Sequence, residues 1–545
     1  MTKAQQLLQK ANQRFSVGLA ATLLASSTLI AAVLGFYRDK LLIRNFLDDL
    51  PGYLDAYQAA FKIPDFMYFV LVSGALSVTF IPVFNARMST GNKKSAWELS
   101  SSLFNLLAVV TMVVSVLIII FADPLIRYVV APGISEPDLA IAMMRIIAVN
   151  PFLFALSSML SSMQQATGRF FFFTLAPIVY NIGIIIGILT SQTELSLFGV
   201  TIWEGGIMNV AYGVVLGSVL QLIVSSFGMI GMKFDYRPLI FWRNKGFQEV
   251  QRLLPPRSFA QGIDYFLSFV ETNIASRMGP GVLSRYQYAL TLHLMPINLI
   301  GVAISTAVFP QMSERLEAGR MDLFRKELQA VLRVIIWLAL PVSLFIFLCR
   351  GYIVGILKDG GDNTIATILG FLVIAILFRS IYHIASRAFY AQHDTKTPLY
   401  TTMVAIALNI ILAVAFFQAG YGPVGLALAQ SIVAVVEVIL LFFIMQTRLN
   451  NLLNTVFWRA IVKMLSATGL MAIVTYLMVA IVPYTSNDRT FFAVLLKIVI
   501  IAIVSFTSYI MFSHMFRLSE PQPIIAKFKK VIFRSYPTLG GRRPE

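Results

Sequence analysis

Long apolar runs alternate with short polar segments along most of the chain. Fourteen such runs occur, near residues 18–36, 57–84, 101–121, 139–164, 170–190, 207–231, 256–276, 288–312, 326–348, 364–391, 397–417, 424–445, 459–482 and 491–514. A helix of about 20 apolar residues spans roughly 30 Å of hydrocarbon. Runs this long and continuous indicate helices, because barrel strands would be short and alternating. We therefore predict an all-α polytopic membrane protein with about 14 transmembrane helices.

The chain also repeats itself at an offset of 228 residues. In two windows the identical pairs are Met67, Leu71, Ala75, Ser77, Pro82 and Arg87 with Met295, Leu299, Ala303, Ser305, Pro310 and Arg315, and Gln164, Thr167, Thr174, Ile178, Asn181 and Ile182 with Gln392, Thr395, Thr402, Ile406, Asn409 and Ile410. A constant offset predicts a duplicated six-helix unit whose two copies enter the membrane in the same orientation and enclose a cavity.

This duplication divides the chain into predicted parts. An N-lobe (18–231) and a C-lobe (256–445) are joined by a basic linker (232–255), and two further helices (459–514) lie outside the repeat. The two ends are an N-terminal segment (1–17) and a basic tail (515–545). Lysine and arginine are concentrated in the segments that lie inside if the N-terminus is inside, so both termini are predicted to be cytoplasmic.

Composition agrees with a membrane protein and excludes several other classes. Of 545 residues, 58% are hydrophobic and only 13% are charged, which leaves too little polar surface for a soluble protein of this size. The net charge of +17 is explained by topology and anionic lipid head groups, so membrane lipids rather than nucleic acid are the expected partners. One cysteine and four histidines form no disulfide or metal pattern, and no phosphate loop or nucleophile motif occurs. A transporter without a cofactor is predicted, not an enzyme.

Charged residues inside the predicted spans are the candidate functional groups, because such groups persist at bilayer depth mainly where they face a cavity or a partner. Arg38 and Lys62 could present cations to an anionic group. From spacing alone, the favoured interpretation is that Arg38 forms an interfacial cluster with Asp39 and Lys40 at the end of the first helix.

The seventh span carries a candidate ion site. Glu271 is followed by Thr272 and Asn273, and carboxylate, hydroxyl and amide oxygens suit a sodium ion or a proton. The alternative is that Glu271 pairs with a basic residue, for which the candidates are Arg277, Arg379 and Arg387. Glu437 in the twelfth span is predicted to lie near a helix end or in a local pair.

Several motifs resemble the MurJ (MviN) family of lipid II flippases. They are Gly35–Asp39, Asp55–Ala56 leading into Ala60–Pro64, Gly74–Ser77, Phe80–Phe84, Ala131–Gly133, Arg387–Ala391 running into Asp394–Pro398, and Gly425–Ala429. The resemblance implies a flippase of the multidrug/oligosaccharidyl-lipid/polysaccharide exporter (MOP) superfamily in the bacterial cytoplasmic membrane. Such a protein moves the peptidoglycan precursor lipid II to the outer leaflet by alternating access, and its last two helices form a groove for the lipid tail.

The resemblance also assigns roles to particular residues. Arg38, Asp55 and Lys62 match positions that act on the substrate. His293 is a further candidate for substrate binding, because the 228-residue offset places it opposite Asp65. Three arginines that the family carries are absent, and their positions are occupied by Ala32, Tyr68 and Thr291.

The family's proposed sodium site is only partly present. Its seventh-span acid aligns with Glu271 and its asparagine with Asn409, but a further acid is replaced by Ala413. Coupling to Na⁺ or H⁺ is therefore an expectation that rests on two residues.

Two other functions remain open at this point. The missing arginines favour a flippase for another lipid-linked saccharide, such as a polysaccharide precursor. A non-transporting scaffold that binds cell-wall synthesis proteins is the second alternative. The expected substrate of the first hypothesis is lipid II or a similar polyprenyl-pyrophosphate-linked sugar.

Overall fold

The computed structural model describes residues 17–73, 79–193, 195–197, 200–203, 205–232, 234–449, 452–485, 488 and 490–522. The predicted N-terminal segment, apart from Val17, and the part of the predicted tail after 522 lie outside the described residues. The chain divides into two compact units, Met1–Arg285 and Tyr286–Glu545, and each is treated by itself below.

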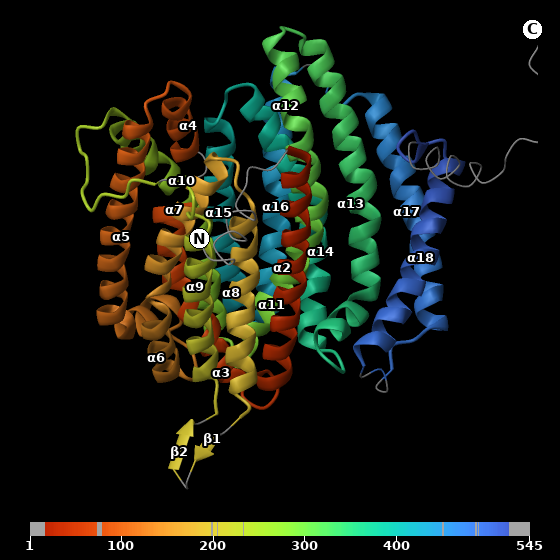
Figure 1. The fold of residues 1–545 in the computed structure, drawn as a ribbon. Coiled ribbons are helices and arrows are strands. Elements are labelled where there is room, and N and C mark those ends of the chain that lie inside the picture. The colour runs from red at the N-terminus through yellow and green to blue at the C-terminus, as the bar shows by residue number, and fades with distance from the viewer. Residues whose placement is uncertain are drawn as a thin grey trace, which may run out of the picture. The chain divides into compact units, whose positions relative to one another are not determined.

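Helices dominate the first unit (Figure 1). They are α2 (Val17–Phe46), α3 (Pro51–Tyr68), the π-helical turn η1 (Phe69–Ser73), α4 (Ile81–Ser89), α5 (Lys93–Pro124), the π-helical turn η3 (Leu125–Val130), α6 (Pro137–Ile147), α7 (Asn150–Ala166), α8 (Phe171–Thr190), α9 (Met208–Phe227) and α10 (Lys245–Ser276). Between α8 and α9, strands β1 (Leu195–Leu197) and β2 (Val200–Trp203) form an antiparallel pair. The described part is otherwise helical, as predicted.

The second unit is helical throughout its described residues. After α11 (Val282–Pro296), which begins in the first unit, come η4 (Ile297–Val302), α12 (Ala303–Glu317), α13 (Met321–Leu357), α14 (Asn363–Ala391), α15 (Lys396–Gln418), α16 (Gly422–Arg448), α17 (Thr455–Ile481) and α18 (Phe491–Met515).

Eleven helical segments within the described residues are long and apolar enough to cross a membrane. All eleven coincide with predicted spans. The other three predicted spans (18–36, 57–84 and 256–276) correspond to α2, to α3 with α4, and to α10. The multi-pass architecture is confirmed, while the number fourteen stays a prediction.

The 228-residue repeat reappears in the backbone. The π-helical turns η1 and η4 begin at Phe69 and Ile297, which are 228 residues apart. π-Helical turns are rare and often mark functional sites. Their recurrence at the offset therefore supports the predicted duplication independently of residue identities.

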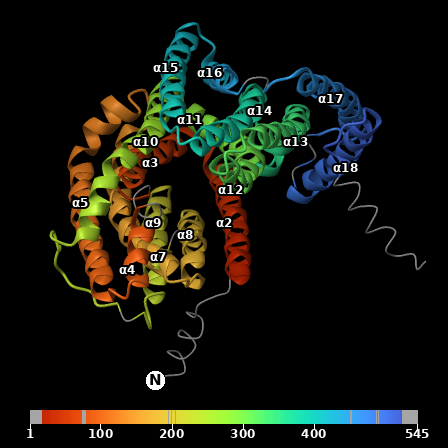
Figure 2. The same cartoon turned by 90° about the horizontal axis from the view of Figure 1, so that it is seen from above.

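Helices α8 and α9 pack closely because glycines line both contact faces. A β-carbon on Gly183 would lie 2.3 Å from the α-carbon of Gly217, and one on Gly187 would lie 2.7 Å from that of Gly213. Both pairs show the small-xxx-small spacing with which membrane helices let their backbones approach. The two helices lie side by side in both views of the molecule (Figures 1 and 2).

Helix α10 packs within the first unit, although the repeat predicts it as the first helix of the C-lobe. It begins at Lys245, inside the predicted linker. Tyr265 stacks on Phe69 at 4.4 Å between ring centroids. The amide nitrogen of Asn273 donates to the Val129 carbonyl oxygen at 2.8 Å, and a β-carbon on Gly133 would lie 2.6 Å from the α-carbon of Arg277. These contacts explain the Ala131–Gly133 motif, because only glycine allows so close an approach.

The two helices outside the repeat pack on α13 within the second unit (Figure 2). Trp337 on α13 donates from Nε1 to the Ser513 hydroxyl at 3.1 Å and accepts at its carbonyl oxygen from the Tyr509 hydroxyl at 2.9 Å. Both partners belong to α18 and are buried. A single aromatic residue thus holds α18 on the core of this unit by hydrogen bonds as well as by packing.

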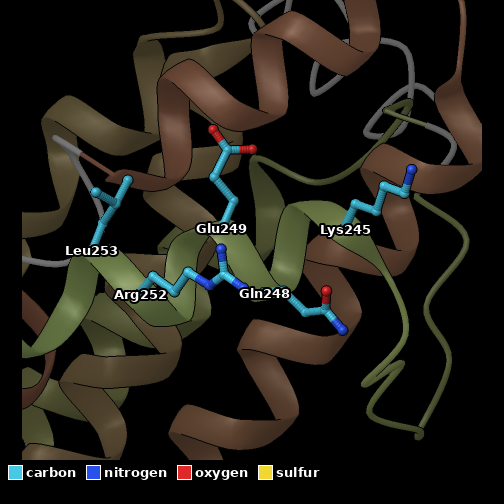
Figure 3. A pocket seen from close by; sticks show the side chains of 5 residues that line it. All are labelled: Lys245, Gln248, Glu249, Arg252 and Leu253. Carbon is cyan, nitrogen blue, oxygen red and sulfur yellow. The ribbon is translucent and has the colours of Figure 1, made fainter.

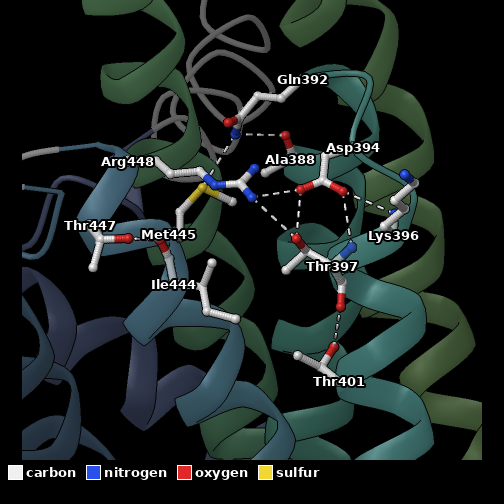
Figure 4. A network of polar contacts seen from close by, with 10 residues as sticks. All are labelled: Ala388, Gln392, Asp394, Lys396, Thr397, Thr401, Ile444, Met445, Thr447 and Arg448. Atoms are coloured by element: carbon white, nitrogen blue, oxygen red, sulfur yellow. Dashed lines mark hydrogen bonds and ion pairs between the residues drawn. The ribbon is translucent and has the colours of Figure 1, made fainter.

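The motif around Asp394 joins three helices of the second unit (Figure 4). Its carboxylate accepts from the backbone nitrogens of Lys396 and Thr397 at the start of α15, at 3.0 and 2.9 Å, and pairs with Arg448 at the end of α16 at 2.7 Å. Burial alone would raise the pKa of the Asp394 carboxyl, but the bonds from Thr397 and Arg448 outweigh it and lower the pKa to about 2. This motif therefore has a structural role, as a helix cap and tether.

Enlarging a contact-face glycine should weaken the α8–α9 pair. We expect Gly183→Ala to lower the free energy of unfolding by about 1–3 kcal/mol, because the added methyl group meets backbone that cannot turn away. Gly469→Ala on α17 is the matched control, since nothing lies within 4 Å of its added methyl group. Thermal unfolding of the purified variants in detergent measures both, and equal stability of the two would contradict this packing.

Candidate functional site

Arg38 lies inside a helix and not at its end. The predicted first span stops at residue 36, but α2 continues to Phe46. Nε and Nη2 of Arg38 donate to one carboxylate oxygen of Asp39, at 3.0 and 2.8 Å, and Nη1 donates to the side-chain oxygen of Asn181 on α8 at 3.1 Å. The side chain of Arg38 is 25% exposed. The guanidinium is thus oriented by two partners from different helices and stays accessible.

Lys62 is also held by a neighbouring helix. Its Nζ donates to the hydroxyl of Ser268 on α10 at 3.0 Å. Asp65, one turn further along α3, is within electrostatic range of both Lys62 and Arg38. The structure therefore gathers two cations and a carboxylate in the first unit, and this charge balance differs from a purely cationic site.

Asp55 is fully engaged in a helix cap. Its carboxylate accepts from the backbone nitrogens of Gly281 and Ser284, at 2.6 and 2.8 Å, and from the Ser284 hydroxyl at 2.6 Å. Gly281 immediately precedes α11 and Ser284 lies in its first turn, where a negative charge also interacts favourably with the helix dipole. Asp55 is 3% exposed. Asp55 thus fixes the start of α11, the part of this helix that belongs to the first unit, and its predicted contact with substrate stays a prediction.

The three positions without the expected arginine carry no replacement charge. Ala32 and Thr291 are exposed, and the Thr291 hydroxyl bonds back to the Gln287 carbonyl oxygen of its own helix. The Tyr68 hydroxyl lies 2.8 Å from the Ser158 hydroxyl. Tyr68 thus replaces a cation by a neutral hydrogen bond between helices.

The two predicted ion-coupling residues are both buried. Glu271 on α10 is 4% exposed. Asn409 on α15 is completely buried, and neither its amide nitrogen nor its amide oxygen has a hydrogen-bond partner among the described residues. A buried amide without partners costs free energy. This cost makes Asn409 a candidate to receive a ligand.

His293 on α11 is buried and half satisfied. Its Nδ1 lies 3.3 Å from the Leu290 carbonyl oxygen, while Nε2 has no partner within the described part of the chain. His293 is also within electrostatic range of Arg379 on α14. The structure therefore brings His293 together with a cation that the sequence did not single out as a binding residue.

That cation forms a buried ion pair. Nη1 of Arg379 lies 2.6 Å from one carboxylate oxygen of Glu437 on α16, and the Thr402 hydroxyl donates to the other oxygen at 2.9 Å. Glu437 is 1% exposed. The predicted local pair for Glu437 is confirmed, and of the bases considered as partners for Glu271, Arg379 pairs with Glu437 instead.

The sequence reasoning missed Asn181, Ser268 and Arg379 as parts of these clusters. Asn181 could have been found, since the repeat pairs it with Asn409. Arg379 was considered only as a partner for Glu271, and its pairing with Glu437 was missed. Ser268 gave no signal, because its partner Lys62 lies 206 residues away in the sequence. No group of three or more potential metal-binding side chains occurs among the described residues.

A pocket of about 440 Å³ opens on the first turns of α10 (Figure 3). It is lined by Lys245, Gln248, Glu249, Arg252 and Leu253. Glu249 lies 3.4 Å from Nη2 of Arg87 and is 54% exposed. Mixed charges on one exposed helix face are typical of a solvated surface, so this pocket is not assigned a ligand.

Known proteins share both the sequence and the fold. The family model for the lipid II flippase MurJ matches residues 52–511. A probable lipid II flippase MurJ from Thermotoga maritima is 26% identical over 512 residues, which cover 92% of this chain and 97% of the relative.

Two solved structures show the likeness of the fold. One, described as lipid II flippase MurJ in the inward closed conformation, superposes with a TM-score of 0.73 at 24% identity and covers 92% of this chain and 100% of its own. An inward-facing MATE family transporter of the MOP superfamily gives 0.66 at 16% identity, covering 80% and 99%. Because the family model covers most of the chain, the chain belongs to the lipid II flippase MurJ family.

Proposed function

We propose that this protein is a flippase that moves lipid II from the inner to the outer leaflet of the bacterial cytoplasmic membrane by alternating access. The observation that carries the proposal is the accessible guanidinium of Arg38, held by Asp39 and Asn181 inside α2, the first of the predicted spans. The pyrophosphate and sugar-peptide head of lipid II cannot cross hydrocarbon unaided. A cation that the protein already holds offers the charge-assisted hydrogen bonds that replace the hydration of this head group.

The distribution of basic residues supports the orientation in this proposal. Lysine and arginine are enriched in the segments that are cytoplasmic when both termini are cytoplasmic. The head group would then enter from the side on which peptidoglycan precursors are made. In the same proposal, α17 and α18 border the groove for the polyprenyl tail, which stays in lipid.

Growth of cells depleted of their own lipid II flippase tests the proposal. The wild-type chain should restore growth, and the double variant Arg38→Ala, Lys62→Ala should not. Each lost charge-assisted contact weakens head-group binding by about tenfold or more. Arg237→Ala should behave as wild type, because Arg237 lies at an exposed position and pairs only with nearby Asp235 among the described acids.

The outcome separates the flippase from its alternatives. Full growth of the double variant would favour a scaffold for cell-wall synthesis proteins that does not transport. The neutral side chains at Ala32, Tyr68 and Thr291 favour a second candidate function, the flipping of another lipid-linked saccharide. Competition between lipid II and such precursors in a flipping assay decides between the two substrates.

We further propose that a cation, Na⁺ or H⁺, couples to transport through Glu271 and Asn409. The two copies of the repeat differ in a way that supports this idea. Asn181 accepts from Arg38 and donates to the Pro177 carbonyl oxygen at 3.0 Å. Its counterpart Asn409 has no partner among the described residues. Na⁺ or H⁺ bound at Asn409 would then take the place that the guanidinium of Arg38 takes at Asn181.

Transport by inside-out vesicles should therefore depend on sodium or on pH and should lose this dependence in Glu271→Gln and in Asn409→Leu. Substitution removes a charged or amide oxygen ligand, so ion affinity falls. Glu249→Gln on the same helix is the control, because its carboxylate is exposed. The coupling proposal fails if transport is unchanged by Glu271→Gln, by sodium removal and by pH.

A further inference from the structure

The two side chains of the Arg379–Glu437 ion pair differ in how much of each is exposed. Glu437 is 1% exposed, and its two carboxylate oxygens accept from Arg379 and from Thr402. The Thr402 hydroxyl also lies 3.0 Å from that of Tyr382. Arg379 keeps 24% of its side chain exposed. The negative end of the pair is thus hidden and hydrogen-bonded, whereas the positive end is presented outward.

Arg379 has hydrogen-bonding capacity to spare. A guanidinium carries five N–H donors, and the bond to Glu437 uses one nitrogen, Nη1. Among the described residues no hydrogen bond from Nε or Nη2 is present, and the guanidinium carbon also lies 5.8 Å from the centroid of the Tyr382 ring. The remaining edge has the fork geometry that binds phosphate with two parallel bonds.

The depth of Arg379 argues against contact with lipid tails. It lies twelve residues before Ala391 at the end of α14, which corresponds to about 18 Å along a helix. Asn363, at the other end of α14, is sixteen residues away, so Arg379 lies near the middle of a helix that is long enough to cross a membrane. An accessible guanidinium at that depth persists where it faces water or a ligand.

The rest of α14 beyond Arg379 extends the polar surface. His383 and Arg387 follow at intervals of four residues and so share its helix face, and both are partly exposed. No acidic residue occurs between Arg379 and Ala391. Nearer the start of the helix, the exposed side chains of Phe371 and Ile374 are apolar. The polar stripe is therefore confined to one part of α14.

His293 adds a hydrogen-bond acceptor near this cation. With Nδ1 bonded to the Leu290 carbonyl oxygen, the proton resides on Nδ1 and the lone pair on Nε2 is free. A neutral imidazole adds no like charge beside Arg379. Its Nε2 can accept from a hydroxyl or an amide N–H. Cation and acceptor together suit a ligand that carries phosphate next to a sugar or peptide.

We propose that Arg379, held by Glu437, is an anion-binding residue of the second unit that contacts the phosphate of the transported head group, with His293 accepting from a neighbouring hydroxyl or amide. The proposal rests on the proposed function and adds a cation to the second unit, in which Thr291 occupies the position of an expected arginine. In this proposal, α14 contributes to specificity for a phosphate-linked saccharide. Arg379 binds the phosphate, and Glu437 positions the guanidinium of Arg379.

A double variant distinguishes this role from a merely structural one. Breaking a buried ion pair by one substitution is destabilising, whereas replacing both partners is often tolerated. We expect Arg379→Gln, Glu437→Gln to melt close to wild type yet to bind polyprenyl pyrophosphate and lipid II about tenfold or more weakly. Arg379→Lys, which still pairs with Glu437, should fold and bind several-fold more weakly, because an ammonium lacks the fork. Arg350→Gln on α13 is the matched control and should bind as wild type.

Binding to the purified full-length protein in lipid nanodiscs provides the measurement, with a neutral polyprenol as the reference ligand. All variants should bind this neutral polyprenol with the same affinity. Wild-type affinity of the double variant or of Arg379→Lys for the pyrophosphate lipid would overturn the proposal and leave the ion pair structural. If the wild-type protein binds neither phosphate-bearing lipid, the proposed function fails and this inference fails with it.

Discussion

A charged side chain in a membrane protein of long apolar helices persists mainly where the protein holds it, and this constraint organises the polar groups of both units. In the first unit, Arg38 is fixed by Asp39 and Asn181. In the second, Glu437 is fixed by Arg379 and Thr402. Each cluster joins side chains from different helices, so the groups that could bind a charged head group also help to hold the helices together. Binding chemistry and helix packing are therefore built from the same contacts.

The two copies of the repeat share a backbone pattern, but their side chains make different contacts. The π-helical turns at Phe69 and Ile297 and the asparagines at 181 and 409 show that the backbone pattern is shared. The environment of the two asparagines is not shared, since one is bonded to Arg38 and the other has no described partner. A buried amide that nothing satisfies is costly. This difference between Asn181 and Asn409 indicates that the asparagine of the second copy is not there only to stabilise the fold.

The hydropathy pattern predicted correctly where helices occur, but it predicted their first and last residues poorly. Apolar length reports how much of a helix meets lipid, but α2 and α10 continue into polar residues that tertiary contacts satisfy. Arg38 was placed at a helix end for this reason, although α2 extends to Phe46. The family resemblance identified Asp55 as important, and the structure shows a physical reason, the cap on α11. Partners such as Ser268 for Lys62 could not be predicted, because 206 residues separate them and neither sits in a local motif.

The position of Arg379 bears on how few cations a head-group site needs. A surface arginine loses side-chain freedom when it binds a ligand, and this loss opposes binding. Arg379 has already lost that freedom in folding, because Glu437 and Thr402 fix one edge of the pair. A preorganised guanidinium therefore gives more affinity per contact than a flexible one. One held arginine on α14 can thus offset part of the loss at Thr291 on α11, and it does so by linking substrate affinity to the stability of the α14–α16 contact.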